Sequence, residues 1–266
     1  MSARDETPDE VLRVRLAQWA ASSDPADNRD RLAAAFAPTA GESVDLVVLP
    51  EAFACDFGSP EAGLGQFAET SDGPFATRLH DLAREHATTA VAGMFETSPD
   101  PTRPYNTLVM RGATAAEYRK IHLYDSFGYR ESDRVAAGAL QPVVVDLNGW
   151  RVGLSTCYDL RFPELYRALA DQGAEVVLVL AAWLPGERKV EHWETLLAAR
   201  AIENTAYVVG VGQPEPRYCG HSLVVGPRGE VLLGLGGGEE VGEVALSRED
   251  LGAARAANPS LANRRL

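Results

Sequence analysis

The feature that most constrains the fold is a set of short, almost fully apolar runs separated by segments with helical spacing. Residues 44–49 are apolar at every position except Asp45, and residues 176–180 are apolar throughout. Strands of this kind are buried on both faces, as in a sheet that helices cover. After the second run, residues 190–204 place Val190, Trp193 and Leu197 on one helix face. This alternation predicts a layered α/β protein.

The rest of the pattern adds strands and helices along the whole chain. Asn148-Gly149 lies between two apolar runs and is a strong signal for a two-residue hairpin turn, so the strand after it leads directly to Cys157. We expect helices over residues 27–36, 75–86, 162–171 and 190–204. We expect strands over residues 12–16, 44–49, 89–95, 107–110, 116–121, 143–147, 151–156, 176–180, 207–211, 223–225 and 230–233.

The chain length allows one large domain or two of ordinary size. It has 266 residues, of which 45% are hydrophobic. No Pro/Ser-rich linker or abrupt change of charge divides it, and the candidate catalytic residues extend from Glu51 to Cys157. We therefore expect a single domain over residues 12–266, preceded by a polar N-terminal extension of residues 1–11.

The acidic composition excludes several classes of partner. The formal net charge is −13 at pH 7, and the sequence pI is near 4.9. Such a surface attracts neither nucleic-acid phosphates nor anionic membranes, and no apolar stretch is long enough to span a bilayer. The first eleven residues lack the basic start and apolar core of a secretory signal. We expect a cytoplasmic protein that acts on a small molecule.

The cysteines and histidines give no support to a disulfide framework or a metal site. Cys55, Cys157 and Cys219 form an odd set without Cys-x-x-Cys spacing, and the five histidines include no His-x-x-x-His pair. Residues 234–238 are rich in glycine but lack the lysine and the helix start of a phosphate-binding loop. We expect a turn there, and neither a metal nor a cofactor.

Cys157 is the strongest candidate for a catalytic nucleophile. It follows an apolar strand and precedes Pro163, a residue that suits the first turn of a helix. Because backbone amides at a helix start favour negative charge, we expect this environment to stabilise a thiolate. For an isolated buried cysteine a packing role is the ordinary interpretation, and only other segments can change it.

Two further segments place an acid and a base at comparable strand ends. Glu51 ends the run Leu-Val-Val-Leu-Pro-Glu, and Lys120 lies in Tyr-Arg-Lys-Ile-His-Leu. Together with the motif Cys-Tyr-Asp-Leu-Arg-Phe-Pro-Glu-Leu that begins at Cys157, they resemble the nitrilase superfamily of carbon-nitrogen hydrolases, which combines glutamate, lysine and cysteine in this order. The sequence is most similar to the amidase branch that includes omega-amidase and deaminated glutathione amidase, from about Val14 to Asn263.

The resemblance implies a fold and a mechanism. The fold is a four-layer α-β-β-α sandwich, often paired into a homodimer or a larger homo-oligomer. Cys157 attacks the amide carbon to form a thioester, and Glu51 carries protons to the departing ammonia and from the incoming water. Lys120 and the backbone N–H of Tyr158 bind the oxyanion. Glu131 matches a further family glutamate that positions the lysine and the substrate.

Three residues near the nucleophile are candidates for substrate binding. Tyr158 and Arg161 follow Cys157 closely, and Trp183 ends the next strand. Packing in the core, or pairing of Arg161 with a nearby carboxylate, is an equally good interpretation. The resemblance favours a short dicarboxylic acid monoamide, and Arg161, Arg188 or Lys189 could receive its distal carboxylate.

Other functions are compatible with parts of the sequence. The residues around Ser155 begin like the Gly-x-Ser-x-Gly elbow of serine hydrolases but lack the final glycine. A cysteine enzyme with His192 or His221 as its base would not need the glutamate or the lysine. The same scaffold could also serve a nitrilase, an N-carbamoyl amino acid amidohydrolase, or a catalytically silent binding or assembly protein.

Overall fold

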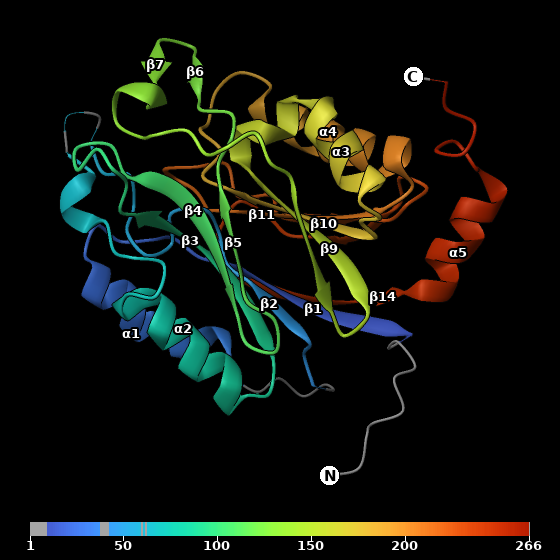
Figure 1. The fold of residues 1–266 in the computed structure, drawn as a ribbon, viewed down its shortest axis with the longest axis horizontal. Coiled ribbons are helices and arrows are strands. Elements are labelled where there is room, and N and C mark those ends of the chain that lie inside the picture. The colour runs from blue at the N-terminus through green and yellow to red at the C-terminus, as the bar shows by residue number, and fades with distance from the viewer. Residues whose placement is uncertain (1–9, 38–42, 60, 62, 266) are drawn as a thin grey trace.

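Two six-stranded sheets face each other at the centre of the molecule, and a pair of helices covers the outer face of each sheet (Figure 1). The computed structural model describes residues 10–37, 43–59, 61 and 63–265. Residues 1–9 of the expected N-terminal extension lie outside this part of the chain. The layers follow the order helix, sheet, sheet, helix, which is the α-β-β-α arrangement that the family resemblance implies.

The two sheets have similar topologies, with three parallel strands at the centre and antiparallel strands beside them. The first sheet has the order β14-β1-β2-β3-β4-β5, formed by β1 (Val11–Gln18), β2 (Leu46–Val48), β3 (Thr89–Glu96), β4 (Tyr105–Arg111), β5 (Ala116–Arg119) and β14 (Glu240–Ser247). The second has the order β13-β12-β11-β10-β9-β8, formed by β8 (Val143–Leu147), β9 (Trp150–Thr156), β10 (Val176–Ala181), β11 (Tyr207–Gly212), β12 (Leu223–Val225) and β13 (Val231–Gly234).

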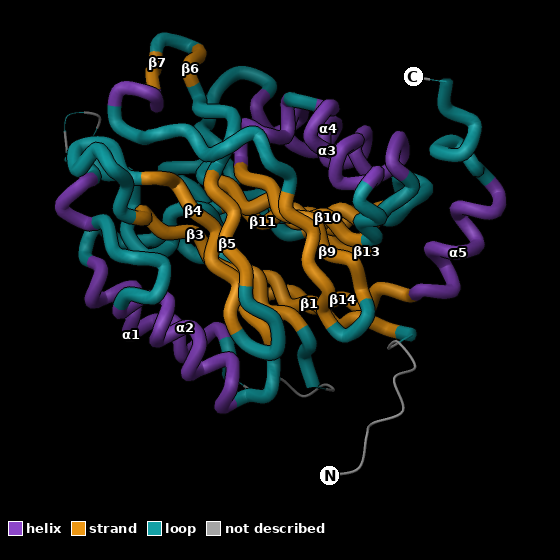
Figure 2. The backbone as a smooth tube through the Cα atoms, in the orientation of Figure 1, coloured by secondary structure: helices purple, strands orange, loops and turns teal. Residues whose placement is uncertain are grey.

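Four helices form the outer layers, and short elements connect the strands (Figure 2). The first sheet is covered by α1 (Pro25–Ala35) and α2 (Pro74–Glu85), and the second by α3 (Pro163–Asp171) and α4 (Lys189–Asn204). A last helix, α5 (Arg248–Ala257), follows β14. The short elements are the hairpin strands β6 (Asp125–Ser126) and β7 (Tyr129–Arg130) and the 3-10 helices η1 (Gly65–Phe67), η2 (Glu131–Asp133) and η3 (Cys157–Arg161).

Strand β2 shows why its sequence is apolar on both sides. Successive side chains of a strand point to opposite faces of the sheet. Leu46 and Val48 join the core between the two sheets, whereas Val47 joins the core under α1 and α2 with Leu79 of α2. Both faces are therefore buried, as the continuous apolar run predicts.

The expected elements are present with boundary shifts of a few residues, whereas β14, α5 and the short elements β6, β7, η1 and η2 were not expected. Asn148 and Gly149 have φ values of 52° and 81°, which suit the tight turn joining β8 to β9. Strand β14 and helix α5 come from a segment to which the sequence pattern assigned no structure. Strand β14 pairs antiparallel with β1 over its full length and completes the first sheet.

Candidate active site

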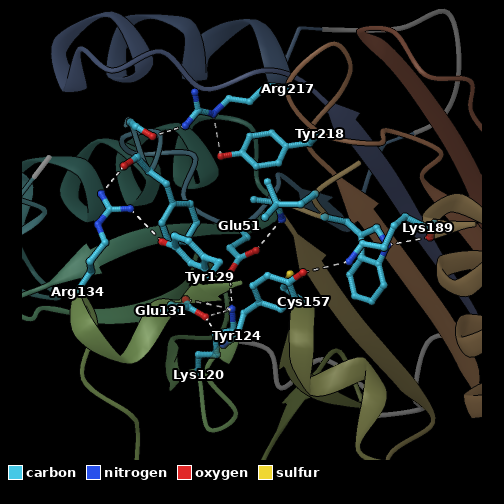
Figure 3. A pocket seen from close by; sticks show the side chains of 15 residues that line it. Glu51, Lys120, Tyr124, Tyr129, Glu131, Arg134, Cys157, Lys189, Arg217 and Tyr218 are labelled. Carbon is cyan, nitrogen blue, oxygen red and sulfur yellow. Dashed lines mark hydrogen bonds and ion pairs between the residues drawn. The ribbon is translucent and has the colours of Figure 1, made fainter. Parts of the chain in front are cut away.

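A pocket lies where strands β2, β5, β9 and β10 end, and the four residues expected to be catalytic all line it (Figure 3). Glu51 follows β2, Lys120 follows β5, Glu131 begins η2, and Cys157 follows β9. In Figure 3 the carboxylates of Glu51 and Glu131 both point toward the Lys120 ammonium, with the Cys157 sulfur beside them. Segments up to 106 residues apart in the sequence thus meet at one point, since Glu51 and Cys157 are that far apart.

Glu51 is held rigidly by hydrogen bonds on both carboxylate oxygens. Its Oε1 accepts from Lys120 Nζ at 3.0 Å and from Asn106 Nδ2 at 2.7 Å, and its Oε2 accepts from the backbone N–H of Ala182 at 2.6 Å. Its backbone carbonyl accepts from Gln213 Nε2 at 2.9 Å. The side chain is 1% exposed. A buried charge needs this degree of pairing, because an uncompensated one would be costly.

The backbone at Glu51 passes very close to strand β3, and Gly93 makes that approach possible. A Cβ atom on Gly93 would lie 2.3 Å from the backbone nitrogen of Ala52 and 2.6 Å from Cα of Glu51. Ala52 itself has a φ of 53°, a left-handed conformation that costs free energy for a residue other than glycine. The turn that presents Glu51 is therefore held by its close contact with β3, which maintains the unfavourable conformation of Ala52.

Lys120 is a fully enclosed ammonium between two carboxylates. Its Nζ lies 3.0 Å from Glu51 Oε1 and 2.9 Å from Glu131 Oε2, and its side chain is 2% exposed. Burial alone would lower the pKa of Lys120, but the charges of Glu131 and Glu51 raise it well above its usual value. Glu131 is fixed in turn by the backbone N–H of Tyr124, which donates to Oε2 at 2.6 Å. Lys120 is thus a permanent cation in the pocket.

Cys157 occupies a strained turn but does not have the thiolate-stabilising environment that the sequence suggested. Its φ is 49°, and its side chain lies at the pocket wall with the residue 7% exposed. Burial and the negative charge of Glu51 raise the pKa of the thiol well above its usual value, and the opposing effect of Lys120 does not overcome them. Both effects oppose the thiolate stabilisation that we expect from the helix start. They favour a thiol whose proton a base such as Glu51 removes during the reaction.

The protonated state of Cys157 predicts slow alkylation at neutral pH. Because only the thiolate reacts and its fraction grows as the pH rises toward the raised pKa, the rate of iodoacetamide modification should still be increasing at pH 9. Peptide mass spectrometry after timed alkylation measures this for each cysteine. Cys55, whose pKa burial raises to about 11, serves as the internal comparison. A rate at Cys157 that is already constant between pH 7 and pH 9 contradicts the assignment.

Asp159 ties the turn that carries the cysteine to the loop that carries the lysine. It is fully buried, and its Oδ2 accepts from Thr156 N at 2.9 Å and from the Tyr118 hydroxyl at 2.6 Å. Its Oδ1 accepts from the backbone N–H of His122 at 3.0 Å and lies 2.7 Å from His122 Nδ1. Tyr118 and His122 lie two residues before and after Lys120. One carboxylate therefore sets the position of β9 relative to the lysine loop.

Of the three residues expected to bind substrate, only Trp183 lines the pocket. Tyr158 and Arg161 are not among the lining residues: the Tyr158 ring packs edge-on against Tyr124, and the Arg161 guanidinium lies 4.9 Å from the Trp183 ring centre. Lys189, one of the three cations considered for a distal carboxylate, does line the pocket.

Much of the remaining wall was not expected from the sequence. Tyr124 and Tyr129 come from the two sides of the β6–β7 hairpin, and Arg134 follows η2. On another side, Tyr218 donates a hydrogen bond to Asp56 at 2.8 Å beside Arg217. Asn106 was missed as well, although it donates to both carboxylates of the cluster. In the sequence, Asn106 is marked only as an amide next to the start of a predicted strand, and its burial is seen only in the structure.

The serine and the two histidines that could have supplied a different nucleophile or base do not reach the pocket. Ser155 is fully buried inside β9, where its hydroxyl donates to the Leu178 carbonyl at 2.9 Å. His192 and His221 do not line the pocket: His192 Nδ1 lies 3.5 Å from Arg161, and His221 lies near Glu194. Neither a serine hydrolase nor a cysteine-histidine enzyme fits this arrangement.

Metal-binding clusters and membrane-spanning helices are both absent from the described part of the chain. Residues 10–37, 43–59, 61 and 63–265 contain no group of three or more histidine, cysteine, aspartate or glutamate side chains placed to hold a metal ion. Over the same residues, no helix has both the length and the apolar character that crossing a bilayer requires.

Comparison with known proteins finds relatives over most of the chain. A family model described as carbon-nitrogen hydrolase matches residues 13–256. The chain is 41% identical over 244 residues to "Hydrolase Rv0480c" of Mycobacterium tuberculosis, covering 85% of each chain. It is 37% identical over 257 residues to the deaminated glutathione amidase of Escherichia coli O157:H7, covering 96% of this chain and 97% of the relative.

Solved structures share the fold over almost the entire chain. The XC1258 protein of Xanthomonas campestris, a CN-hydrolase superfamily protein, superposes with a TM-score of 0.87 at 30% identity, covering 97% of this chain and 98% of that one. Saccharomyces cerevisiae Nit3, of the nitrilase superfamily, superposes with a TM-score of 0.86 at 28% identity over the full length of both chains.

Proposed function

Since this chain belongs to the carbon-nitrogen hydrolase family and is an enzyme acting on carbon–nitrogen bonds, we propose that it hydrolyses a small carboxylic amide through a thioester on Cys157. The observation that carries the proposal is the convergence of Glu51, Lys120, Glu131 and Cys157 in one pocket. Their chemistry supplies a nucleophile, a base and a fixed positive charge, which are the groups that amide hydrolysis needs.

Glu51 acts first as the base. Its carboxylate takes the thiol proton of Cys157 as the sulfur attacks the amide carbon, and the carbonyl oxygen becomes negatively charged. The Lys120 ammonium and the backbone N–H of Tyr158 stabilise that oxygen. Glu51 then gives its proton to the nitrogen, the carbon–nitrogen bond breaks, and ammonia leaves a thioester.

A water molecule completes the cycle, and Glu51 is again the base. Glu51 takes a proton from a water molecule that attacks the thioester, and the second tetrahedral intermediate collapses to a carboxylic acid. The sulfur leaves and regains its proton from Glu51. Because the resting cysteine is a thiol, Glu51 is required in both halves of the reaction. Glu131 keeps Lys120 in place throughout, with its Oε2 2.9 Å from the ammonium.

For the substrate we favour a short dicarboxylic acid monoamide. The pocket wall combines aromatic side chains with cations, which suits a small acyl group that carries a carboxylate. Deaminated glutathione is the second candidate, because a relative with that named activity aligns over 96% of this chain. The two differ in the leaving group, which is ammonia for the first and a peptide amine for the second.

A substrate panel tests the proposal. The purified enzyme is incubated with succinamate, glutaramate, deaminated glutathione, N-carbamoyl amino acids and nitriles, and the acid and the amine or ammonia are quantified. We expect equimolar acid and ammonia from the monoamides. Rapid quenching and intact-mass analysis should detect an adduct on Cys157 equal to the substrate less ammonia. A clear preference for nitriles, or turnover without any dependence on Cys157, contradicts the proposal.

A further inference from the structure

Lys189 is a buried cation in the pocket, and no carboxylate among the residues that the structure describes forms an ion pair with it. It is the first residue of α4, it is 6% exposed, and it lines the pocket together with Cys157. The hydrogen bond of its ammonium is to the Tyr124 hydroxyl, at 3.4 Å. A buried ammonium is costly unless it is paired, so this group has an unmet demand for an anion.

Aromatic rings surround this ammonium on several sides. Its Nζ lies 5.1 Å from the ring centre of Tyr124, 4.8 Å from that of Phe127 and 4.9 Å from that of Trp183. Trp183 is fixed in this position because its Nε1 donates to the Lys189 carbonyl at 2.9 Å. Ring faces attract a cation but leave its charge uncompensated. They hold the ammonium in place while its N–H groups stay available to a ligand.

A second cation reinforces the local positive field. The Arg161 guanidinium lies 4.9 Å from the Trp183 ring centre, and no ion pair to it is found within the described part of the chain. Burial and the charge of Arg161 lower the pKa of Lys189, so an anion that binds there relieves an electrostatic strain. This positive region is local, because the chain as a whole carries a net charge of −13.

We propose that Lys189 binds a carboxylate of the substrate, remote from the scissile bond, and that this contact makes the enzyme selective for anionic amides over neutral ones. The inference rests on the proposed function and adds the residue that sets specificity. Figure 3 shows the Lys189 and Lys120 side chains reaching the pocket from different elements, with the Cys157 sulfur drawn between them. One cation would then bind the carboxylate while the other stabilises the oxyanion.

The other cations in or near the pocket are already engaged or lie elsewhere. Arg188 is exposed and forms an ion pair with Glu191 outside the pocket. Arg217 pairs with Asp56 at 3.0 Å. Arg161 does not line the pocket and contributes through its charge. Arg134 also lines the pocket, but its guanidinium donates to the Tyr129 hydroxyl at 2.9 Å and to the Phe57 carbonyl at 2.7 Å. Lys189 is therefore the cation best placed to contact a substrate carboxylate.

The test compares Lys189→Met with wild type on matched pairs of anionic and neutral amides. The pairs are glutaramate with valeramide and succinamate with butyramide, which have equal chain lengths. We expect kcat/KM for the anionic amides to fall by roughly 30-fold, mostly through KM, with less than about a threefold change for the neutral amides. Methionine keeps the aliphatic length, and Lys189→Arg should restore part of the selectivity. Arg188→Met is the matched control and should leave both classes unchanged.

Two further measurements show on which side of the scissile bond the bound carboxylate lies, and whether Lys189 binds a carboxylate in the absence of turnover. N-carbamoyl-β-alanine compared with propylurea places the carboxylate on the amine side, so selective loss on this pair assigns the bound carboxylate to that side. Binding of glutarate and valerate, followed by calorimetry with wild type and Lys189→Met, tests the contact without turnover. If no amide is hydrolysed but only wild type prefers glutarate, the proposed function fails and the Lys189 site stands. Equal losses for anionic and neutral amides, or no loss, overturn the inference.

Discussion

Replacing Cys157 with alanine is expected to lower amide turnover by at least about 10⁴-fold, because the thioester forms on its sulfur. The variant should still fold, since the loss of one buried sulfur atom costs about 1 kcal/mol and alanine tolerates the left-handed turn as cysteine does. The measurement is the release of ammonia from glutaramate under conditions where wild type is saturated, together with a thermal unfolding curve.

The control for this variant is Cys55→Ala. Cys55 is also buried but does not line the pocket, so its replacement should change kcat by less than about threefold if the fold is kept. Cys157→Ser tests the role of the proton more finely. A hydroxyl holds its proton more tightly than a thiol, so serine should not rescue the reaction. Turnover by Cys157→Ala above about 1% of wild type would remove the basis of the thioester mechanism.

The sequence predicts the layered fold because its strongest signals are also the most buried elements. Val47 and its neighbours must be apolar since β2 has helices on one side and a second sheet on the other. Strand β14 gives a weaker signal because it is an edge strand whose residues, such as Glu240 and Val241, are largely exposed. It forms by pairing with β1, more than 220 residues away in the sequence, and local periodicity does not contain that contact.

The same distinction applies to the site: local motifs identify some of its residues, whereas other properties depend on contacts between residues far apart in the sequence. Glu51, Lys120 and Cys157 each lie in a recognisable motif at a strand end, so their types and order were enough to select them. The sequence does not show in which direction the pKa of Cys157 shifts. That direction depends on burial and on the carboxylate of Glu51, 106 residues away. Lys189 is similar: its sequence position next to Arg188 does not show that one cation is enclosed by aromatic rings and the other is solvent-exposed.

Replacing Lys120 with methionine is expected to damage both stability and catalysis. The substitution leaves the carboxylates of Glu51 and Glu131 buried beside each other without the cation that separates them. Breaking a buried pair in this way typically costs about 3–5 kcal/mol of folding free energy. Turnover should fall by at least about 10³-fold, because the oxyanion loses its charged partner. Denaturant unfolding and ammonia release measure the two effects separately.

The stability loss of Lys120→Met should depend on pH with a definite sign. Without the ammonium, the two buried carboxylates have no cation between them, and they repel each other only while both are ionised. The destabilisation is therefore larger at high pH, where both are charged, than at low pH, where the folded variant can take up a proton. Relative to wild type, the deficit at pH 8 should exceed that at pH 5. An equal deficit at both values would show that the loss comes from packing and not from unpaired charge.

A double substitution separates the structural role of Lys120 from its catalytic role. Adding Glu131→Gln to Lys120→Met removes one of the two unpaired charges and should recover about 1–2 kcal/mol of stability at pH 8. Activity should stay lost, because the oxyanion still has no cation near it. If the double variant regains turnover along with stability, Lys120 serves only to neutralise the two glutamates, and the oxyanion must be stabilised by other groups such as the backbone N–H of Tyr158. If neither recovers, the two glutamates are not the source of the instability.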